Sequence, residues 1–185
     1  QTFFNRHLTL IQMIKNILIT GMPGSGKSTV LDKIIAKCPK KVGFVTREML
    51  KDKDREGFEI ETYACDKTIF AHISFNSKYK VSKYFVNIDN LESVLPKVSK
   101  FGKEDILYLD EVGQMQLFSE NFKKLVLKYL DSENISLLTV SKIYDDEFIK
   151  SIKNREDVVL IEINPENRDF QLKFINDLIK KMMKA

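Results

Sequence analysis

The sequence predicts an α/β fold with a mostly parallel central sheet, helices on both faces and an antiparallel strand extension. From residue 15 onward, short apolar runs alternate with stretches of helical spacing, a pattern that favours a parallel sheet covered on both sides. A glycine-rich loop joins the first apolar run to the first helical stretch. Between residues 57 and 75 the pattern changes to the two-residue alternation of half-exposed strands, which is typical of antiparallel pairing.

Apolar spacing assigns the elements of the first half in order. Residues 15–20 (KNILIT) and 41–46 (KVGFVT) are short apolar runs that predict buried strands. Between them, residues 28–38 place apolar side chains at helical spacing and end before Pro39. The alternating segment 57–75 predicts antiparallel strands, and residues 81–86 predict one more.

The second half repeats the alternation of strand and helix. We expect helices over residues 89–101, kinked at Pro96, and over 119–130, 145–153 and from 169 onward. The apolar runs 106–109, 135–140 and 158–163 predict strands. Five parallel strands would bring their carboxyl ends to one edge, where ligands bind in open α/β sheets. The polar segments expected at that edge are 21–28, 47–48, 110–111, 141 and 164–168.

We expect residues 13–185 to form a single domain. The chain has 185 residues, 43% of them hydrophobic and 30% charged, which is ordinary globular composition with enough length for a sizeable core. No repeat and no Gly/Ser/Pro-rich linker divides it. Residues 1–12 differ in character from the rest of the chain, and Met13 is a natural start two residues before the first strand. We therefore expect residues 1–12 to be a non-native or disordered extension outside the fold.

Composition narrows the classes of function. The formal net charge of +4 is mild and its basic residues are scattered, so nucleic-acid binding is not indicated, although it is not excluded. Cys38 and Cys65 lie in no CxxC or Cys/His pattern, so we expect two buried or inert thiols and neither a disulfide framework nor a zinc site. Without a secretory signal or an apolar run of membrane-spanning length, a cytoplasmic protein is the expectation. The expected oligomeric state is a monomer.

The strongest motif is the segment GMPGSGKS at residues 21–28, which matches GxxxxGK[ST] between a strand and a helix. Such a loop brings its amides close to phosphate oxygens and adds the positive end of the helix dipole. Lys27 should reach the β- and γ-phosphates, and the Ser28 hydroxyl should coordinate Mg²⁺. We predict a nucleotide-binding loop made of Gly21, Met22, Pro23, Gly24, Ser25, Gly26, Lys27, Ser28 and Thr29.

Two carboxylates come directly after the apolar run 106–109. Asp110 would hold Mg²⁺ through a bound water from a rigid strand beside the loop. If the strand ends there, Glu111 would point toward the γ-phosphate and act as the general base that activates water. Both could instead cap the following turn. A carboxylate in the place of Glu111 favours a hydrolase over a kinase, which uses basic lids to position an acceptor.

A cation on the transferring phosphoryl group would complete the site. Arg47, Arg55 and Arg168 are the candidates for this role, and each could instead be a solvated side chain. The segment NPENRD at residues 164–169 could hold the nucleobase through Asn167 and Arg168, and cap the last helix through Asn167 or Asp169. Thr139 and Ser141, at the end of a predicted strand, are weaker candidates for contact with the γ-phosphate.

These observations favour a Mg²⁺-dependent hydrolase of nucleoside triphosphates. A kinase that phosphorylates a nucleotide or a nucleoside would use the same loop, and sustained phosphate release without an acceptor would distinguish the hydrolase. A nucleotide-gated module or nucleic-acid-binding protein is the third alternative, and salt-sensitive stimulation by RNA or DNA would favour it.

From about residue 14 to its C-terminus the sequence resembles the small nucleoside triphosphatases called cancer-related or thermophilic nucleotide phosphatases. The resemblance is carried by GMPGSGKST (21–29), GFVT (43–46), RxGF (55–58), Tyr84 with Val86-Asn87, LDEVGQMQLFS (109–119) and NPENRD (164–169).

The resemblance implies a single P-loop NTPase domain that slowly hydrolyses ATP, GTP and other nucleoside triphosphates to the diphosphate, with Mg²⁺ and broad base tolerance. It supports the roles given to Lys27, Ser28, Asp110 and Glu111, and it favours Arg55 over Arg47. Three positions depart from the family pattern, where an arginine, a glycine and a glutamate are usual: Leu50, Phe85 and Gln116.

Overall fold

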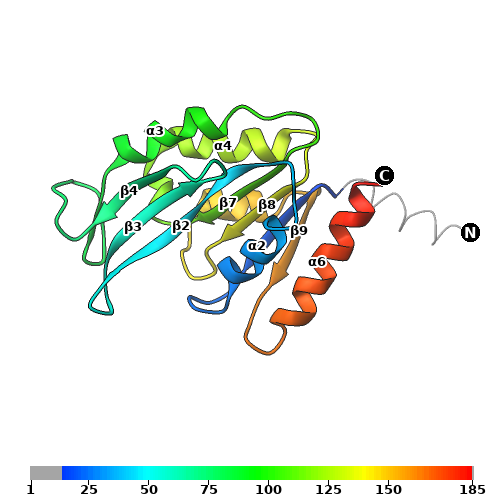
Figure 1. Ribbon diagram of the computed structural model, residues 1–185, viewed down its shortest axis with the longest axis horizontal. Helices are drawn as coiled ribbons and strands as arrows, with labels where there is room; N and C mark the ends of the chain where they lie inside the picture. Colours follow the sequence, from blue (N-terminus) through cyan, green and yellow to red (C-terminus); the bar gives the residue numbers. More distant parts are fainter. Residues whose placement is uncertain (1–13, 185) are drawn as a thin grey trace, which may run out of the picture.

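The computed structural model describes residues 14–184, and within them nine strands form one sheet (Figure 1). The parallel part consists, in spatial order, of β2 (Lys41–Lys51), β7 (Ile106–Val112), β8 (Ser136–Val140), β1 (Asn16–Thr20) and β9 (Val158–Glu162). The antiparallel extension continues outward from β2 through β3 (Asp54–Thr62), β4 (Lys67–His72), β6 (Tyr84–Val86) and β5 (Lys80–Val81).

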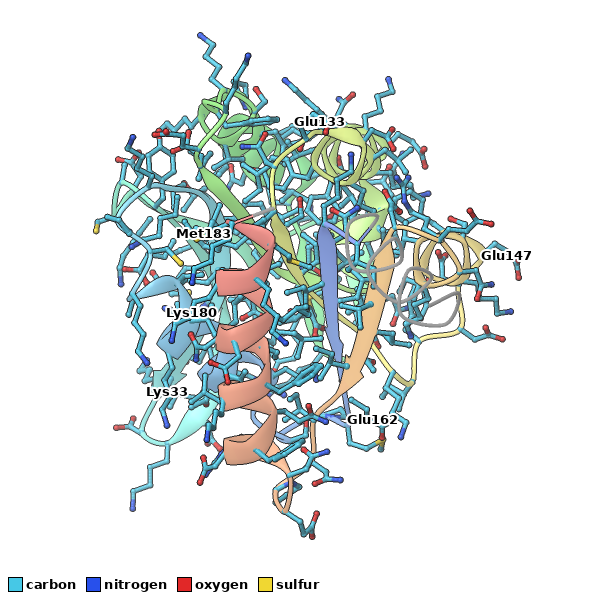
Figure 2. The ribbon with its side chains drawn as sticks, turned by 90° about the vertical axis from the view of Figure 1, so that its right-hand side faces the viewer. Lys33, Glu133, Glu147, Glu162, Lys180 and Met183 are labelled. Atoms are coloured by element: carbon cyan, nitrogen blue, oxygen red, sulfur yellow. The ribbon has the colours of Figure 1, made fainter. Side chains whose placement is uncertain are left out.

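Helices cover both faces of the sheet. On one face lie α2 (Lys27–Ile35) and α6 (Arg168–Met182), and on the other lie α3 (Ile88–Val98), α4 (Glu120–Asp131) and α5 (Glu147–Lys153) (Figure 1). Each face has its own core of buried aliphatic and aromatic side chains. Figure 2 looks onto α6 and shows it alongside β1 and β9, where Ile175 and Ile179 pack against Ile17, Ile19 and Ile161.

Local sequence explains where these helices begin. The side chain of Asn87 accepts a hydrogen bond from the amide of Asn90 at the start of α3, and Ser119 accepts one from Phe122 at the start of α4. Asp146 accepts from two amides at the start of α5. Such caps satisfy amides that have no partner within the helix, and each contributes about 1 kcal/mol.

The α/β class, the five parallel strands and the antiparallel extension are confirmed. Several predicted boundaries were wrong. β2 runs on to Lys51 instead of ending at 46, because it forms a long hairpin with β3 that projects beyond the parallel strands (Figure 1). Residues 81–86 are not one strand, since β5 and β6 form a small hairpin around Ser82. The helix predicted over 89–101 ends at Val98, two residues after Pro96.

Three other expectations concern the ends of the chain, the cysteines and the membrane. The predicted extension 1–12 lies outside the described residues. Both cysteines are free thiols, but only Cys38 is buried, and Cys65 is exposed at a turn beyond β3. Among the helices of residues 14–184, none combines the length and the apolar character that a membrane crossing requires.

Candidate functional site

The glycine-rich loop lies between β1 and α2, at the carboxyl edge of the parallel strands. Gly24 and Gly26 have φ angles of 75° and 98°, a region that side chains disfavour. A Cβ atom at Gly21 would lie 2.4 Å from the carbonyl oxygen of Ile163, so only glycine fits between the loop and the end of β9. Gly26 is the N-cap of α2, and the first amides of a helix have no partner within it. The sequence therefore shapes a loop suited to bind an anion.

Lys27 is the first residue of α2, and its side chain is buried in the loop. Its Nζ atom donates hydrogen bonds to the carbonyl oxygens of Gly21 at 3.0 Å and Met22 at 3.3 Å. The hydroxyl of Ser25, also in the loop, is buried without a hydrogen-bond partner in the described part of the chain. Buried donors of this kind gain most when a ligand supplies oxygen acceptors.

Asp110 lies near the end of β7 with 3% of its surface exposed. Burial raises the pKa of its carboxyl group, while hydrogen bonds from Thr139 and Ser28 and the charge of Lys27 oppose that rise. Thr139 belongs to the neighbouring strand β8, and its hydroxyl donates to Oδ1 of Asp110. Thr139 is itself completely buried. Its hydroxyl therefore binds Asp110 and does not face the cavity, as the hydroxyl of a phosphate sensor would.

The oxygen atoms around Asp110 fit a metal site that substrate would complete. Within residues 14–184, no group of three or more His, Cys, Asp or Glu side chains could hold a metal by itself. Mg²⁺ prefers oxygen ligands, keeps several waters, and is bound by one or two protein groups together with substrate phosphates. A hydroxyl from Ser28 beside a buried carboxylate fits that pattern.

Glu111 is half-buried at the next position of β7. The strand does not end at Glu111, which was the condition for our expectation that this side chain points toward the γ-phosphate. It continues to Val112, and its register with β8 shifts between Leu109 and Val112. Burial, followed by the charge of Asp110, raises the pKa of the Glu111 carboxyl group, and Lys27 opposes the rise. A Cβ atom at Gly113 would lie 2.6 Å from Oε1 of Glu111, so the missing side chain leaves room for this carboxylate.

Two of the candidate arginines lie on the β2–β3 hairpin. Arg47 donates two hydrogen bonds to Asp32 on α2, at 2.7 and 3.0 Å, and one to Glu61 at 3.1 Å. Its guanidinium is therefore committed to two carboxylates. Arg55 donates to the hydroxyl of Tyr84 at 2.8 Å and pairs with Glu48.

Arg55 also stacks over aromatic rings. The centre of its guanidinium lies 5.1 Å from the ring centroid of Phe58 and 5.5 Å from that of Tyr84. These contacts hold the side chain at the wall of a cavity that also contains the phosphate loop.

The segment NPENRD joins β9 to α6 beside the phosphate loop. A Cβ atom at Gly26 would lie 2.8 Å from Cδ of Arg168, so this arginine covers the loop, and its Nε atom is buried without a hydrogen-bond partner in the described residues. Asn167 occupies the N-cap position of α6, but neither it nor Asp169 provides the side-chain cap that we expected. Instead, the side-chain oxygen of Asn167 accepts from the amide of Asn164, and the amide of Asn167 donates to the side-chain oxygen of Asn164, which closes the loop on itself.

One cavity of about 750 Å³ brings most of these residues together. It is lined by ten of the predicted site residues: Gly21, Pro23, Gly24, Gly26, Lys27, Ser28, Thr29, Arg55, Asp110 and Glu111. Met22, Ser25, Asn167 and Arg168 lie outside its lining. Several lining residues on the hairpin and on the loops after β7 and β8 were not predicted from the sequence, among them Thr46, Phe58, Gln114, Met115 and Tyr144.

The phosphate loop follows β1, and the paired carboxylates lie on β7, which is separated from β1 by β8. This arrangement defines a P-loop nucleotide-binding protein. A family model described as NTPase matches residues 16–176. The chain belongs to this family of nucleoside triphosphatases, and it is an enzyme of the phosphohydrolase class.

Relatives in sequence and in structure agree with that assignment. Nucleoside-triphosphatase THEP1 of Thermotoga maritima is 39% identical over 166 residues, which cover 89% of this chain and 95% of the relative. The THEP1 protein of Aquifex aeolicus is 36% identical, and its crystal structure superposes with a TM-score of 0.73 over 88% of this chain and 98% of that chain. The solution structure of a human cancer-related nucleoside triphosphatase is 26% identical, with a TM-score of 0.76 over 90% and 98%.

Proposed function

We propose that this protein hydrolyses ATP, GTP and other nucleoside triphosphates to the diphosphate and phosphate, with Mg²⁺ and with broad base tolerance. The observation that supports the proposal best is the convergence of Lys27, Ser28, Asp110 and Glu111 on one cavity. A phosphate-binding loop alone would serve many activities. A half-buried carboxylate beside it adds a group that can accept a proton from water.

In this proposal the loop amides and Lys27 bind the phosphate chain, while Ser28 and Asp110 hold Mg²⁺. When bound, Mg²⁺ would neutralise negative charge that develops on the phosphate chain. The hydrogen bond from Thr139 fixes the orientation of the Asp110 carboxylate and favours its ionised form. Recognition through main-chain amides and an ammonium group reads phosphate and not base, which supports broad base tolerance.

Glu111 orients the attacking water and accepts its proton. Gly113 leaves space for the carboxylate, and the partial burial of Glu111 limits its access to bulk water. Arg55 supplies the cation that stabilises the transferring group, and its fixed stacking on Phe58 and Tyr84 reduces the entropy lost in that role. One chain supplies every residue in this mechanism, so it requires no second copy and keeps our expectation of a monomer.

Phosphate release from ATP, GTP, CTP and UTP tests the proposal. We expect kcat/KM values within about tenfold of one another, because a single lost base contact is worth about 1–1.5 kcal/mol and the phosphates carry most of the affinity. Chelation of Mg²⁺ with EDTA should abolish turnover, and added Mg²⁺ should restore it. Hydrolysis confined to one base would overturn the base tolerance, and full activity in EDTA would overturn the role of Mg²⁺.

Thr139 gives a separate prediction about the metal site. The substitution Thr139→Val keeps the shape of the side chain and removes the donor to buried Asp110, at a cost on the order of 1–3 kcal/mol. We expect the Mg²⁺ concentration for half-maximal activity to rise on the order of tenfold, while the saturated rate changes less. A magnesium titration of phosphate release measures this.

Thr62→Val is the matched control, because the hydroxyl of Thr62 is equally buried but has no hydrogen-bond partner in the described part of the chain. It should leave the magnesium requirement unchanged. An unchanged requirement in Thr139→Val as well would show that the hydroxyl does not act on the metal site.

A further inference from the structure

The cavity extends across the sheet well beyond the phosphate loop. Its lining passes from the loop after β1, past Ser141 at the end of β8 and Asp110 on β7, to Thr46 on β2 and Phe70 on β4. Strands lie about 4.8 Å apart, so β1 and β4, which are five strand spacings apart in this sheet, are separated by roughly 24 Å. A cavity of this extent has room for a second ligand beside a triphosphate.

The two ends of the cavity differ in what they can bind. Lys27 and the carboxylates on β7 mark the γ-phosphate end of a bound triphosphate, because the lysine of such a loop reaches the β- and γ-phosphates. The α-phosphate end lies at the start of α2, where Arg168 covers Gly26 on the side of β9. The nucleoside therefore leaves toward β9, and the part of the cavity over β2, β3 and β4 lies on the other side of Glu111.

That second part of the cavity, which we call the acceptor compartment, has a largely apolar wall. It is formed by Phe58 on β3, Val81 on β5 and Met115 on the loop after β7, while Phe70 on β4 lies next to the cavity but is fully buried. Polar groups are interspersed: the amide of Gln116 donates to the hydroxyl of Thr46 at 3.3 Å, and Glu48 lies beside them on β2. Mostly apolar walls with few polar groups are typical of small-molecule sites.

The charges of the compartment favour a neutral ligand. Of the basic residues that line the described cavity, Lys27 and Arg55 are assigned to the triphosphate, whereas Arg47 is paired with Asp32 and Lys142 with Glu162. A phosphate-bearing ligand would be left without a charge partner there, which costs several kcal/mol when it is desolvated.

We infer that the acceptor compartment binds a neutral hydroxyl compound with a flat apolar face, the class that includes nucleosides, and that this compound accepts the γ-phosphoryl group. The inference rests on the proposed function, since it uses the same bound triphosphate and the same base. It adds a phosphotransferase activity that competes with hydrolysis whenever an acceptor occupies the compartment.

The transfer uses groups already in place. The acceptor hydroxyl oxygen forms a bond to the γ-phosphorus, and the bond from that phosphorus to the β–γ bridging oxygen breaks. The nucleoside diphosphate leaves with the electron pair of that bond. Glu111 takes the hydroxyl proton and releases it to solvent, so atoms and charge balance without a further reactant.

The test incubates the protein with Mg²⁺ and ATP labelled at the γ-phosphate, with and without each common ribo- and deoxyribonucleoside at millimolar concentration. We expect a labelled nucleoside monophosphate, and more ADP than free phosphate, with at least one nucleoside. The absence of any labelled product, together with no nucleoside binding by ligand-observed NMR, would overturn the inference. Phosphate release without an acceptor measures the proposed hydrolysis separately, so the two failures are distinguishable. Better transfer to nucleoside monophosphates would overturn the preference for a neutral ligand.

The substitution Val81→Trp ties the activity to the compartment, because Val81 is half-buried in its wall and is not one of the residues assigned to hydrolysis. The larger side chain should reduce transfer at least about tenfold, while hydrolysis without an acceptor stays within about twofold. Ile69→Trp is the matched control, since Ile69 is exposed on β4 and does not line the cavity. Thermal unfolding verifies that both variants fold. Equal transfer by Val81→Trp and the unsubstituted protein would place the acceptor elsewhere.

Discussion

Replacing Glu111 with glutamine is expected to lower the rate of nucleoside triphosphate hydrolysis by about 10²–10⁴-fold, the usual contribution of a general base. Glutamine has the shape of glutamate but cannot take a proton from water. The surroundings of this carboxylate make a simple substitution informative, because the room left by Gly113 accepts an amide of the same size. We expect the folded structure and the triphosphate affinity to change little.

Affinity and turnover must be measured separately for this variant. Fluorescence titration with a slowly hydrolysed triphosphate analogue gives the affinity, and single-turnover phosphate release gives the chemical step. Glu156→Gln is the matched control. Glu156 is exposed in the loop before β9, at the amino ends of the parallel strands, whereas the site lies at their carboxyl ends. A Glu111→Gln variant with the turnover of the unsubstituted protein would assign the base to another group.

The parts of this site that sequence could predict are local in the chain. The phosphate loop is a run of eight residues whose conformation is set by short-range sterics at its glycines and by its flanking elements. In the structure the loop lies between β1 and α2, as expected. The carboxylates at 110 and 111 could be anticipated from the apolar run before them. The edge at which they meet the loop is set by the right-handed crossovers of parallel strands.

The parts that sequence could not predict depend on pairing between distant residues. Arg47 was a reasonable candidate for a catalytic cation until the register of the β2–β3 hairpin placed it opposite Glu59 and within reach of Glu61 and Asp32. Arg55 meets Tyr84 across 29 residues of sequence. The secondary-structure propensity of neither arginine predicts such contacts, because they form only when the antiparallel extension folds back over the cavity.

The length of the hairpin has the same origin. The apolar run that predicts β2 ends at residue 46, yet the strand continues through Arg47, Glu48 and Leu50, which are at least partly exposed. Pairing with β3, and not burial, extends it, and hydrophobic periodicity does not detect pairing. The acceptor compartment could not be foreseen for this reason, since the wall that carries Phe58 exists only because the hairpin is long.

Replacing Lys27 with alanine is expected to weaken triphosphate binding and to lower turnover together. A charge-assisted hydrogen bond is worth about 1.5–3 kcal/mol, so affinity should fall about ten- to a hundredfold, and kcat should fall as well because Lys27 also meets the charge that develops in the transition state. The ammonium group lies within the loop, on the carbonyl oxygens of Gly21 and Met22, so a bound phosphate would displace contacts that are already in place.

The matched control for this substitution is Lys33→Ala, which removes an equal charge from an exposed position on the same helix. If the general positive charge of α2 were what attracts the triphosphate, both variants would lose affinity alike and both losses would shrink with added salt. If contact inside the loop is responsible, Lys27→Ala alone loses affinity, and the difference between the variants persists at high salt. Calorimetric titration with ATP at two salt concentrations distinguishes these outcomes, and equal affinities for Lys27→Ala and the unsubstituted protein would contradict the assignment of the phosphate-binding loop.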